Sequence, residues 1–383
     1  MDFAFSDAER QFAESLRRYA QQRLRPEYAQ WDRGMPYPRE RVRELAGLGI
    51  TGLRVPARYG GAEASYVMGG IAAEELARGD YNVTLFLQLS MIAGDILSTY
   101  ASAAVQEEWL PAMASGERII AFGLTEPGAG SDAAALTTTA TRDGDEYVVS
   151  GEKASITFAG MADGCIVFAR MGGGGARGIG AVVVPLDDPG VTRRVYRSTG
   201  ERLSQRGSLV FDGVRVPTGN RIGDERGGFV QAMTAFDYNR AVIALCCVGA
   251  AQQSLDETVE YAKQRHTFGK PIAKHEGVSF QIAEHLTMVA AARLLAYQCL
   301  ALRDRGLPHT KEAAMAKWLG PKVCAEAIHS CILLHGWMGY DQDLPHEQRL
   351  RDVIGLEIGD GTPEIMKAII ARETFGREFA AYK

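Results

Sequence analysis

The sequence predicts an α+β protein built in three segments, with helices at both ends and a β-rich segment between them. Apolar residues recur with a helical period over residues 1–117. Threonine, valine and glycine dominate residues 118–228, where apolar and polar residues alternate as in strands. The helical period returns over residues 229–383. We therefore predict an N-terminal helical domain, 1–117, a middle β domain, 118–228, and a C-terminal helical domain, 229–383.

The first segment begins with a helix-start signal. Ser6 and Glu9 have the spacing of a capping box ahead of the apolar residues Phe12 and Leu16. Further helices are expected near residues 39–48, 67–77 and 105–113. The proline and glycines of "RVPARYGG" at residues 54–61 interrupt them.

The middle segment reads as a series of strands. "TTTATRDGDEYVVSGEK" alternates on both sides of Asp143 and Gly144, which predicts a β-hairpin. "CIVFAR", "IGAVVVP" and "SLVFDGVRVP" are further strand candidates. A GxGxxG match at residues 173–178 precedes another strand rather than a helix, so it lacks the helix N-terminus that a dinucleotide fingerprint needs. We interpret it as a loop between strands.

The last segment contains long helices and an unusual loop. One long helix is expected to end near "QRHTFGK" at residues 264–270, and further helices near 277–306, 311–334 and 363–379. Thr362 is a natural N-cap for a helix with Pro363 at its first position. Asp360 stands between two glycines just before that cap. Its carboxylate either complements the helix dipole or serves as a general base held on a rigid loop.

Composition excludes several classes of function. The chain is 46% hydrophobic and 23% charged, with a net charge of −5 and no long run of one sign, which argues against nucleic acid as a partner. The longest apolar run, residues 241–250, is too short to span a bilayer, and no leader peptide is evident at Met1, so we expect no membrane partner and a cytoplasmic location. Six cysteines are scattered without CxxC spacing, and HExxH and GxSxG are absent. We therefore expect buried thiols, no metal and no covalent nucleophile.

Two loops suit the binding of an anion. "LTEPGAGSD" at residues 124–132 offers free backbone N–H groups and the hydroxyls of Thr125 and Ser131 to a phosphate or a flavin edge, or it is a plain interdomain turn. In "QRHTFGK", Arg265 and Thr267 either clamp an anion or complement the end of the long helix.

Five motifs in order resemble those of the acyl-CoA dehydrogenase family of flavoenzymes. They are "LTEPGAGSD", "GDEYVVSGEKASIT", "FDYNRAVIALCCVGAAQQSLDETVEYAKQRHTFGKPI", "HGWMGY" and "IGDGTPEIMKAIIARE", and the resemblance covers nearly the whole chain. It implies a middle β-barrel and a C-terminal four-helix bundle with FAD between them, an acyl-CoA thioester substrate, an electron-transfer flavoprotein as acceptor and a homotetramer. A carboxylate would take the α-proton while the β-hydride passes to the flavin.

The resemblance also assigns residues. By this resemblance the cofactor would be bound by Leu124, Thr125, Gly130, Ser131, Ser155, Thr157, Arg265, Thr267, Phe268, Gly336, Thr362 and Glu364, with Arg265 and Phe268 reaching the FAD of a neighbouring subunit. The substrate would be contacted by Ser131, Tyr238, Arg240 and Gly361, with Arg240 near the catalytic carboxylate. The backbone N–H of Asp360 would face the thioester oxygen.

The chain departs from the family pattern at its reacting centre. Asp360 stands where most relatives have Glu, so its carboxylate is shorter by about one C–C bond of ~1.5 Å. The family's alternative base position falls at Asn239, which takes up no proton. Asp95, in the segment that lines the acyl pocket of relatives, is a second candidate base, or a helix-start or turn residue after Gly94. Ser155, Leu333 and Trp337 replace the Trp, Gln and Gly of many relatives.

These departures favour the alicyclic branch of the family, which acts on thioesters such as cyclohexane-1-carboxyl-CoA or cyclohex-1-ene-1-carboxyl-CoA. A ring carbon bonded to the carbonyl is crowded, and a shorter base gives it room. Three alternatives stay open: a short- or branched-chain acyl-CoA dehydrogenase, a flavin oxidase of the same fold resembling nitroalkane oxidase, and a non-catalytic relative that kept FAD.

Overall fold

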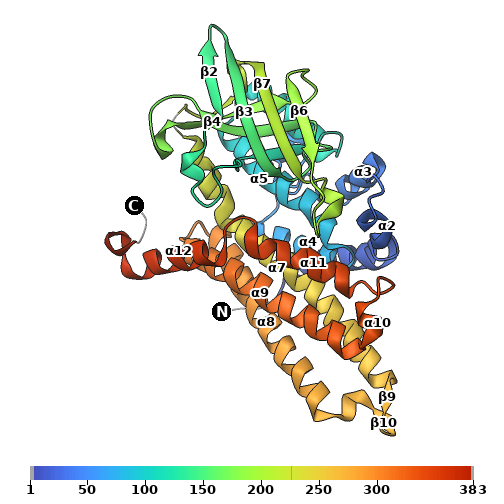
Figure 1. Ribbon diagram of the computed structural model, residues 1–383. Coiled ribbons are helices and arrows are strands. Elements are labelled where there is room, and N and C mark those ends of the chain that lie inside the picture. The colour runs from blue at the N-terminus through green and yellow to red at the C-terminus, as the bar shows by residue number, and fades with distance from the viewer. Residues whose placement is uncertain (1–3, 226, 381–383) are drawn as a thin grey trace.

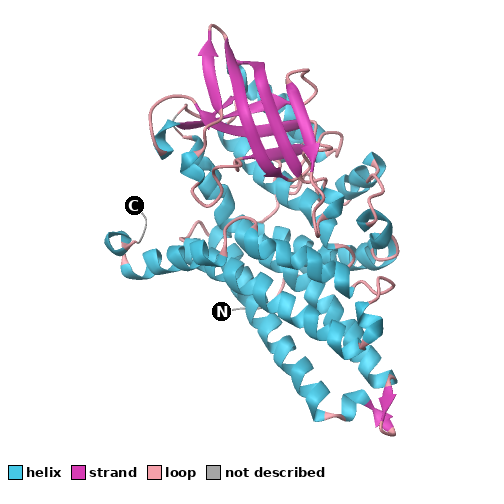
Figure 2. Ribbon diagram, viewed as in Figure 1, coloured by secondary structure: helices cyan, strands magenta, loops and turns pink. Residues whose placement is uncertain are grey.

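The computed structural model describes residues 4–225 and 227–380, and the predicted order of helices, strands and helices is confirmed (Figure 1). Figure 2 shows the large sheet at one end of the molecule, helices through the rest, and a small two-stranded hairpin at the opposite end. The N-terminal helices are α1 (Asp7–Tyr19), α2 (Tyr28–Asp32), α3 (Arg39–Gly47), α4 (Tyr66–Ala77), α5 (Thr84–Tyr100) and α6 (Ala103–Ala114).

The capping box that the sequence predicts at the first helix is formed. Ser6 Oγ accepts from the backbone N–H of Glu9 at 3.3 Å, and Glu9 Oε2 accepts from the backbone N–H of Ser6 at 2.8 Å. The α3, α4 and α6 helices lie within two residues of their predicted bounds.

Two helices among the described residues are long and apolar enough to cross a membrane, judged by length and composition alone. The sequence did not indicate them, because polar residues interrupt the apolar runs in both. The two helices are Tyr81–Tyr100, which consists of α5 and the short helical turn before it, and α8 (Glu276–Asp304). The apolar window of α5 is 67% buried inside the protein, so the core accounts for its composition. The window of α8 is only 28% buried, which leaves an apolar surface in need of explanation.

The middle domain is one eight-stranded sheet with the order β6-β7-β3-β2-β4-β5-β8, in which β1 pairs in parallel with β4. The predicted hairpin is confirmed: Asp143 faces Glu146 across the turn, and Gly144 has φ +62°. The rejected GxGxxG match indeed lies between two antiparallel strands. The strands are β1 (Ile120–Gly123), β2 (Thr139–Asp143), β3 (Glu146–Ile156), β4 (Gly164–Arg170), β5 (Ile179–Pro185), β6 (Val191–Val195), β7 (Gly207–Pro217) and β8 (Arg221–Ile222).

The C-terminal domain packs α7, α8, α9 and α11 together, with α7 about 55 Å long. A small hairpin of β9 (His266–Thr267) and β10 (Lys270–Pro271) lies at the end of α7 farthest from the sheet (Figure 1). The last helix was expected to reach residue 379 but ends at Phe375, because Gly376 takes φ +106°. The helices are α7 (Gly228–Gln264), α8 (Glu276–Asp304), α9 (Thr310–His335), α10 (Trp337–Tyr340), α11 (His346–Ile358) and α12 (Pro363–Phe375).

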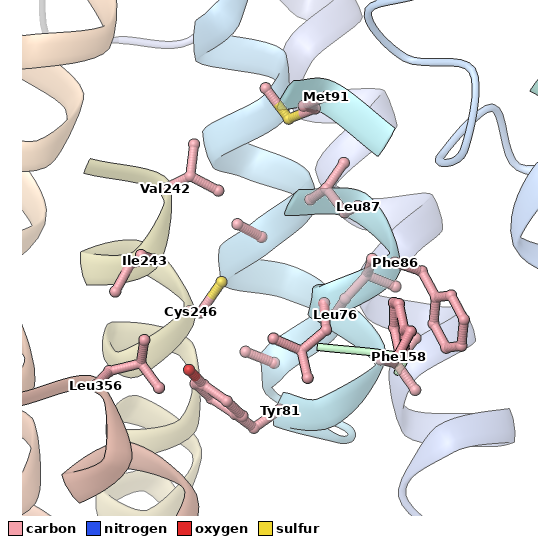
Figure 3. Packing of buried hydrophobic residues seen from close by; sticks show 14 of the residues in the cluster. Leu76, Tyr81, Phe86, Leu87, Met91, Phe158, Val242, Ile243, Cys246 and Leu356 are labelled. Atoms are coloured by element: carbon pink, nitrogen blue, oxygen red, sulfur yellow. The ribbon is translucent and has the colours of Figure 1, made fainter. Parts of the chain in front are cut away.

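The α5 helix joins the two helical domains to the sheet. Figure 3 shows Leu87 and Met91 of α5 on one side of the core and the sulfur of Cys246 between α7 and α5. On another side, Phe86 of α5 stacks on Phe158 of the β domain with ring centroids 4.4 Å apart. All six cysteines are buried and unpaired, as expected. The three domains therefore meet around α5, and the cavity described next lies at this junction.

Candidate active site

A cavity of about 640 Å³ lies where α5, the β domain, α7, α11 and the loop before α12 meet. This volume is in the usual range for small-molecule sites. Its lining brings together residues far apart in the sequence: Leu85, Gln88, Leu89 and Ile92 of α5, Phe122, Leu124, Thr125, Ser155, Ile156 and Thr157 of the β domain, Phe236, Asn239 and Ile243 of α7, and Asp360. The rest of the wall is formed by residues of α11 and by Ser198, Thr199, Gly200, Glu201 and Arg206.

Asp360 reaches the cavity from a strained turn between α11 and α12. Its φ of +56° is left-handed, a conformation that Asp tolerates better than most residues because its short side chain adds little crowding. Thr362 caps α12 as predicted, accepting from the backbone N–H of Ile365 at 3.4 Å. Asp360 Oδ2 accepts from Asn239 Nδ2 of α7 at 2.9 Å. Asn239 is itself buried, so α7 fixes the direction of the carboxylate.

Two buried cations, Lys317 and Arg240, lie close enough to that carboxylate to interact with its charge. Lys317 of α9 donates from Nζ to the carbonyls of Leu356, at 2.5 Å, and Gly361, at 2.9 Å, which flank Asp360 in sequence. Burial lowers the pKa of Lys317 to about 8, and the charge of Asp360 opposes this shift. Arg240 is buried and pairs with Asp237 at 2.8 Å. The base loop is thus held by hydrogen bonds to its backbone and by opposite charge.

The turn at residues 124–132 contributes Leu124 and Thr125 to the cavity wall and is fixed by a buried ion pair. Lys153 Nζ donates to Glu126 Oε1 at 2.8 Å and to the carbonyl of Leu124 at 3.1 Å. The backbone N–H groups of Thr137 and Thr138 also donate to the Glu126 carboxylate, at 2.7 and 2.9 Å. Burial disfavours the charge of Glu126, but these donors outweigh it and lower its pKa to about 2.

This side of the cavity leaves polar groups free for a ligand. The backbone at Gly128 and Gly130 borders open space. Ser155 takes φ +57° and Arg206 donates to its carbonyl at 3.0 Å, while Thr157 lines the cavity beside apolar Ile156. Hydroxyls, an open glycine turn and an apolar wall suit a flat ligand with polar edges. Within the described residues, no group of three or more His, Cys, Asp or Glu side chains could hold a metal ion.

Comparisons with known proteins identify the family. The N-terminal, middle and C-terminal domain models of acyl-CoA dehydrogenases match residues 6–117, 121–214 and 226–375. The short-chain specific mitochondrial acyl-CoA dehydrogenase of Rattus norvegicus is 36% identical over 362 residues, which are 94% of this chain and 88% of that protein. The chain belongs to the acyl-CoA dehydrogenase family. Its members are FAD-dependent oxidoreductases that act on CH–CH groups.

Solved structures agree with this assignment. Butyryl-CoA dehydrogenase from Megasphaera elsdenii superposes with a TM-score of 0.94 at 33% identity, covering 98% of this chain and 100% of that one. A chain solved in a study of the electron transferring flavoprotein of Acidaminococcus fermentans and flavin-based electron bifurcation gives a TM-score of 0.94 at 30% identity, covering 98% and 99%.

The residues present fit the FAD of this family of dehydrogenases. The hydroxyls of Thr125, Ser155 and Thr157 border the cavity, and the open turn at Gly128 and Gly130 admits a ligand close to the backbone. Leu124 lines the same wall, while Gly130 and Ser131 lie on the turn beside it. Gly361, Thr362 and Glu364 directly follow Asp360, where Thr362 caps α12 and Glu364 occupies its first turn.

The second candidate base, Asp95, is not among the residues that line the cavity. It lies inside α5, so the expectation that it begins a helix or sits in a turn is wrong. Its carboxylate accepts from Arg54 Nε at 3.0 Å and from the hydroxyl of Tyr66 at 2.9 Å. Tyr238, expected near the substrate, packs its ring 4.6 Å from Tyr66 and is fully buried outside the cavity lining. This arrangement favours a structural ion pair over a base.

The remaining predicted cofactor residues lie far from this cavity within one chain. Thr267 is in the hairpin β9–β10 at the far end of α7, and Arg265 and Phe268 adjoin it (Figure 1). Gly336 ends α9. Phe268 is 97% exposed. The prediction that Arg265 and Phe268 contact a neighbouring subunit's FAD stays a prediction.

The site also contains residues that were not predicted from the sequence, among them the polar side chains of Lys317, Gln88 and Arg206. The first two carry a signal that the sequence does show. Lys317 falls in register with Ala313, Gly320 and Cys324 on the apolar face of its helix. Gln88 lies between Leu85 and Ile92 in the same way. A polar residue on an apolar face is a candidate for function. Arg206 stands in a short loop with no such pattern.

Proposed function

We propose that this acyl-CoA dehydrogenase oxidises an alicyclic acyl-CoA thioester, such as cyclohexane-1-carboxyl-CoA or cyclohex-1-ene-1-carboxyl-CoA, with Asp360 removing the α-proton. One observation carries the proposal: the carboxylate of Asp360 borders the cavity and is aimed by the amide of Asn239. A general base must be held in place because a misplacement of about 1 Å costs on the order of 100-fold in rate.

The short side chain of Asp360 supports the ring substrate. An aspartate reaches about one C–C bond of ~1.5 Å less far than a glutamate on the same backbone, so the α-carbon has to approach the loop more closely. A compact ring packed against Leu89, Ile92 and Phe122 would meet this demand, since these side chains form an apolar wall of the same cavity.

FAD is the cofactor of this proposal. When bound, it accepts the β-hydride of the acyl group. Thr125, Ser155 and Thr157 would hold its polar edges, and the Glu126–Lys153 pair keeps that wall rigid. The backbone N–H of Asp360 would donate to the thioester oxygen, while Lys317 holds the turn that carries it.

The test is an anaerobic titration of the yellow protein with linear, branched and cyclic acyl-CoA thioesters, recording the bleaching of the flavin. We expect the cyclic thioesters to bleach it fastest. Asp360→Asn should slow bleaching by about 10²- to 10⁴-fold while the protein stays yellow. Asp95→Asn should leave the bleaching rate within a few-fold. Loss of bleaching in Asp95→Asn but not in Asp360→Asn would move the base to Asp95.

A second function is a short-chain acyl-CoA dehydrogenase, which the likeness to the short-chain specific and butyryl-CoA enzymes favours. In the same titration it predicts fastest bleaching with butyryl-CoA, and that outcome would overturn the alicyclic proposal. A flavin oxidase would instead ignore the thioesters and reduce O₂ rapidly. A non-catalytic relative would keep its colour with every thioester.

We also propose that an electron-transfer flavoprotein accepts the electrons and that the chain assembles as a homotetramer. The likeness to the chain from the Acidaminococcus fermentans study supports the acceptor. Exposed apolar side chains along α8 support assembly, because a soluble surface seldom leaves such side chains grouped on one helix.

A further inference from the structure

Gln88 is the polar residue that α5 contributes to the wall of the cavity. It is 4% exposed, and its neighbours on the same face of the helix are Leu85, Leu89 and Ile92, which also line the cavity. None of these neighbours carries a charge or a polar group. An amide in such surroundings needs hydrogen-bond partners, because an unpaired polar group in an apolar site is costly.

The hydrogen bonds around Gln88 fix which end of its amide faces the cavity. Thr84 donates its hydroxyl proton to the carbonyl of Tyr81 at 2.6 Å, so its oxygen is left as an acceptor. Gln88 Nε2 lies 3.3 Å from that oxygen and 3.4 Å from the sulfur of Cys246. The nitrogen end therefore points between α5 and α7. The opposite orientation would set two lone pairs against each other.

The oxygen end of Gln88 is left as an acceptor for a ligand. Within the described part of the chain, no hydrogen bond reaches Gln88 Oε1, although the side chain lines the cavity. A carbonyl oxygen with free lone pairs attracts a hydroxyl or amide donor. A cationic donor is disfavoured because Leu85, Leu89 and Ile92 offer it no counter-charge.

The distance of Gln88 from the base can be followed along α7. Asn239, which holds Asp360, and Ile243 both line the cavity, and Cys246, which contacts Gln88, is one turn further on the same face. Seven residues of helix separate Asn239 from Cys246, a rise of about 10 Å. Figure 3 shows the Cys246 sulfur between the two helices. Gln88 therefore contacts the cavity about two helical turns along α7 from the reacting centre.

From this geometry we infer that Gln88 is a specificity residue whose Oε1 accepts a hydrogen bond from a hydroxyl group on the acyl moiety, distal to the thioester. The inference rests on the proposed function and narrows its substrate to a hydroxylated alicyclic acyl-CoA. A site that pairs with a substrate hydroxyl discriminates against the analogue lacking it, because the unpaired oxygen is then buried without a partner.

The experiment compares cyclohexane-1-carboxyl-CoA with its 3- and 4-hydroxy derivatives in the FAD-loaded protein, under anaerobic conditions. The measured quantity is the rate of flavin bleaching divided by the dissociation constant of each thioester. A second readout is the affinity of the matching thioethers, which cannot react. For the wild type we expect at least one hydroxylated ring to be favoured about tenfold or more in both measurements.

The test variant is Gln88→Met, which keeps the length of the side chain and removes the acceptor. It should reduce the preference to about one, mainly by weakening the hydroxylated thioester. The matched control is Gln348→Met on α11. Gln348 is also 4% exposed with an unpartnered oxygen, but it does not line the cavity. This control should keep the wild-type preference.

Two outcomes would overturn the inference: a wild type that treats both kinds of ring alike, or a Gln88→Met variant that keeps the preference. The first outcome is measured on the wild type alone, so it does not depend on whether the Gln88→Met variant folds. Failure of the proposed function looks different, because then neither ring bleaches the flavin while butyryl-CoA does. In that case butyryl-CoA and 4-hydroxybutyryl-CoA are compared in the wild type, Gln88→Met and Gln348→Met. A preference for the hydroxylated thioester that only Gln88→Met loses would still assign the role to Gln88.

Discussion

Lys317 is a buried cation that, among the residues that the structure describes, hydrogen-bonds to no carboxylate and instead donates to two backbone carbonyls near Asp360. Its side chain is 2% exposed. Burial lowers its pKa from 10.5 to about 8, although the charge of Asp360 pulls the other way. Burying a charged lysine this deeply in a helical bundle costs free energy, because the charge loses its hydration. Its presence at this position therefore supports a role in positioning the base.

The lowered pKa of Lys317 predicts how stability depends on pH. Between pH 8 and 10.5 the unfolded chain binds a proton at this lysine and the folded chain does not, so stability rises with pH in that window. The free energy of unfolding of the wild type, minus that of Lys317→Met, should increase by about 3 kcal/mol from pH 7 to 10.5. Urea unfolding measures it, and subtracting the variant removes the titration of other groups.

The control is Lys322→Met, an exposed lysine of the same helix that pairs with Glu326. Its difference from the wild type should stay flat across the same range. A flat difference for Lys317→Met as well would show that the lysine titrates normally in the folded protein, and its assignment as a buried charged clamp would be wrong.

At the level of single residues, the sequence indicated the location of Asp360 but not its geometry. Thr362 and Pro363 are local helix-start signals, so the cap could be predicted. The left-handed φ of Asp360 could not be predicted, because the flanking glycines suggested that only they would adopt the unusual backbone angles of the turn. The hydrogen bond from Asn239 to Asp360 joins residues 121 positions apart, and no local sequence pattern indicates such a contact.

At the level of elements, the turn at residues 124–132 depends on one buried pair. Lys153 of β3 is fully buried and Glu126 nearly so. Lys153 donates to the carbonyl of Leu124 in the turn, and the carboxylate of Glu126 accepts from the backbone N–H of Thr137 just beyond it. Lys153→Met leaves the carboxylate of Glu126 buried without its cation. We expect the free energy of unfolding to fall by about 3–5 kcal/mol, and bound FAD to be lost more readily on dilution.

The double variant Glu126→Gln with Lys153→Met separates charge from packing. Because it removes both charges, it should recover much of the lost stability, measured by urea unfolding at pH 7. If the single and double variants were equally unstable, the shape of the lysine rather than its charge would hold the turn. FAD content, read from visible absorbance, reports on the turn itself.

Elements with local signals were predicted well and those set by packing were not. The capping box of α1 and the hairpin at Gly144 follow from residues within a few positions of each other. Asp95 was misplaced because Gly94 suggested a break, whereas α5 runs on unbroken. Gly94 lies close to the backbone of Arg54 and Val55, so its small size serves packing and not a turn.

At the scale of the whole molecule, the sequence predicted three domains in order but not the junction that makes the site. The cavity is lined by residues of α5, the β domain, α7 and α11. Which faces of these elements meet is decided by long-range packing, as with Phe86 on Phe158. The resemblance to a family supplied this arrangement, since no periodicity within one segment reports on a surface of another.

The exposed apolar side chains of α8 lead to a prediction for the assembled protein. Phe280, Met288 and Leu294 are 60%, 42% and 52% exposed on one broad side of this helix. If this side covers a second copy, the wild type should sediment well above its chain mass of 41.6 kDa, and Met288→Glu with Leu294→Glu should shift it to smaller species without loss of helical signal. Met35→Glu, an exposed methionine in the N-terminal domain, is the matched control and should sediment like the wild type. A wild type that sediments as a single chain at micromolar concentration would mean that α8 covers no second copy, and the homotetramer would have to be given up together with the neighbouring-subunit role of Arg265 and Phe268.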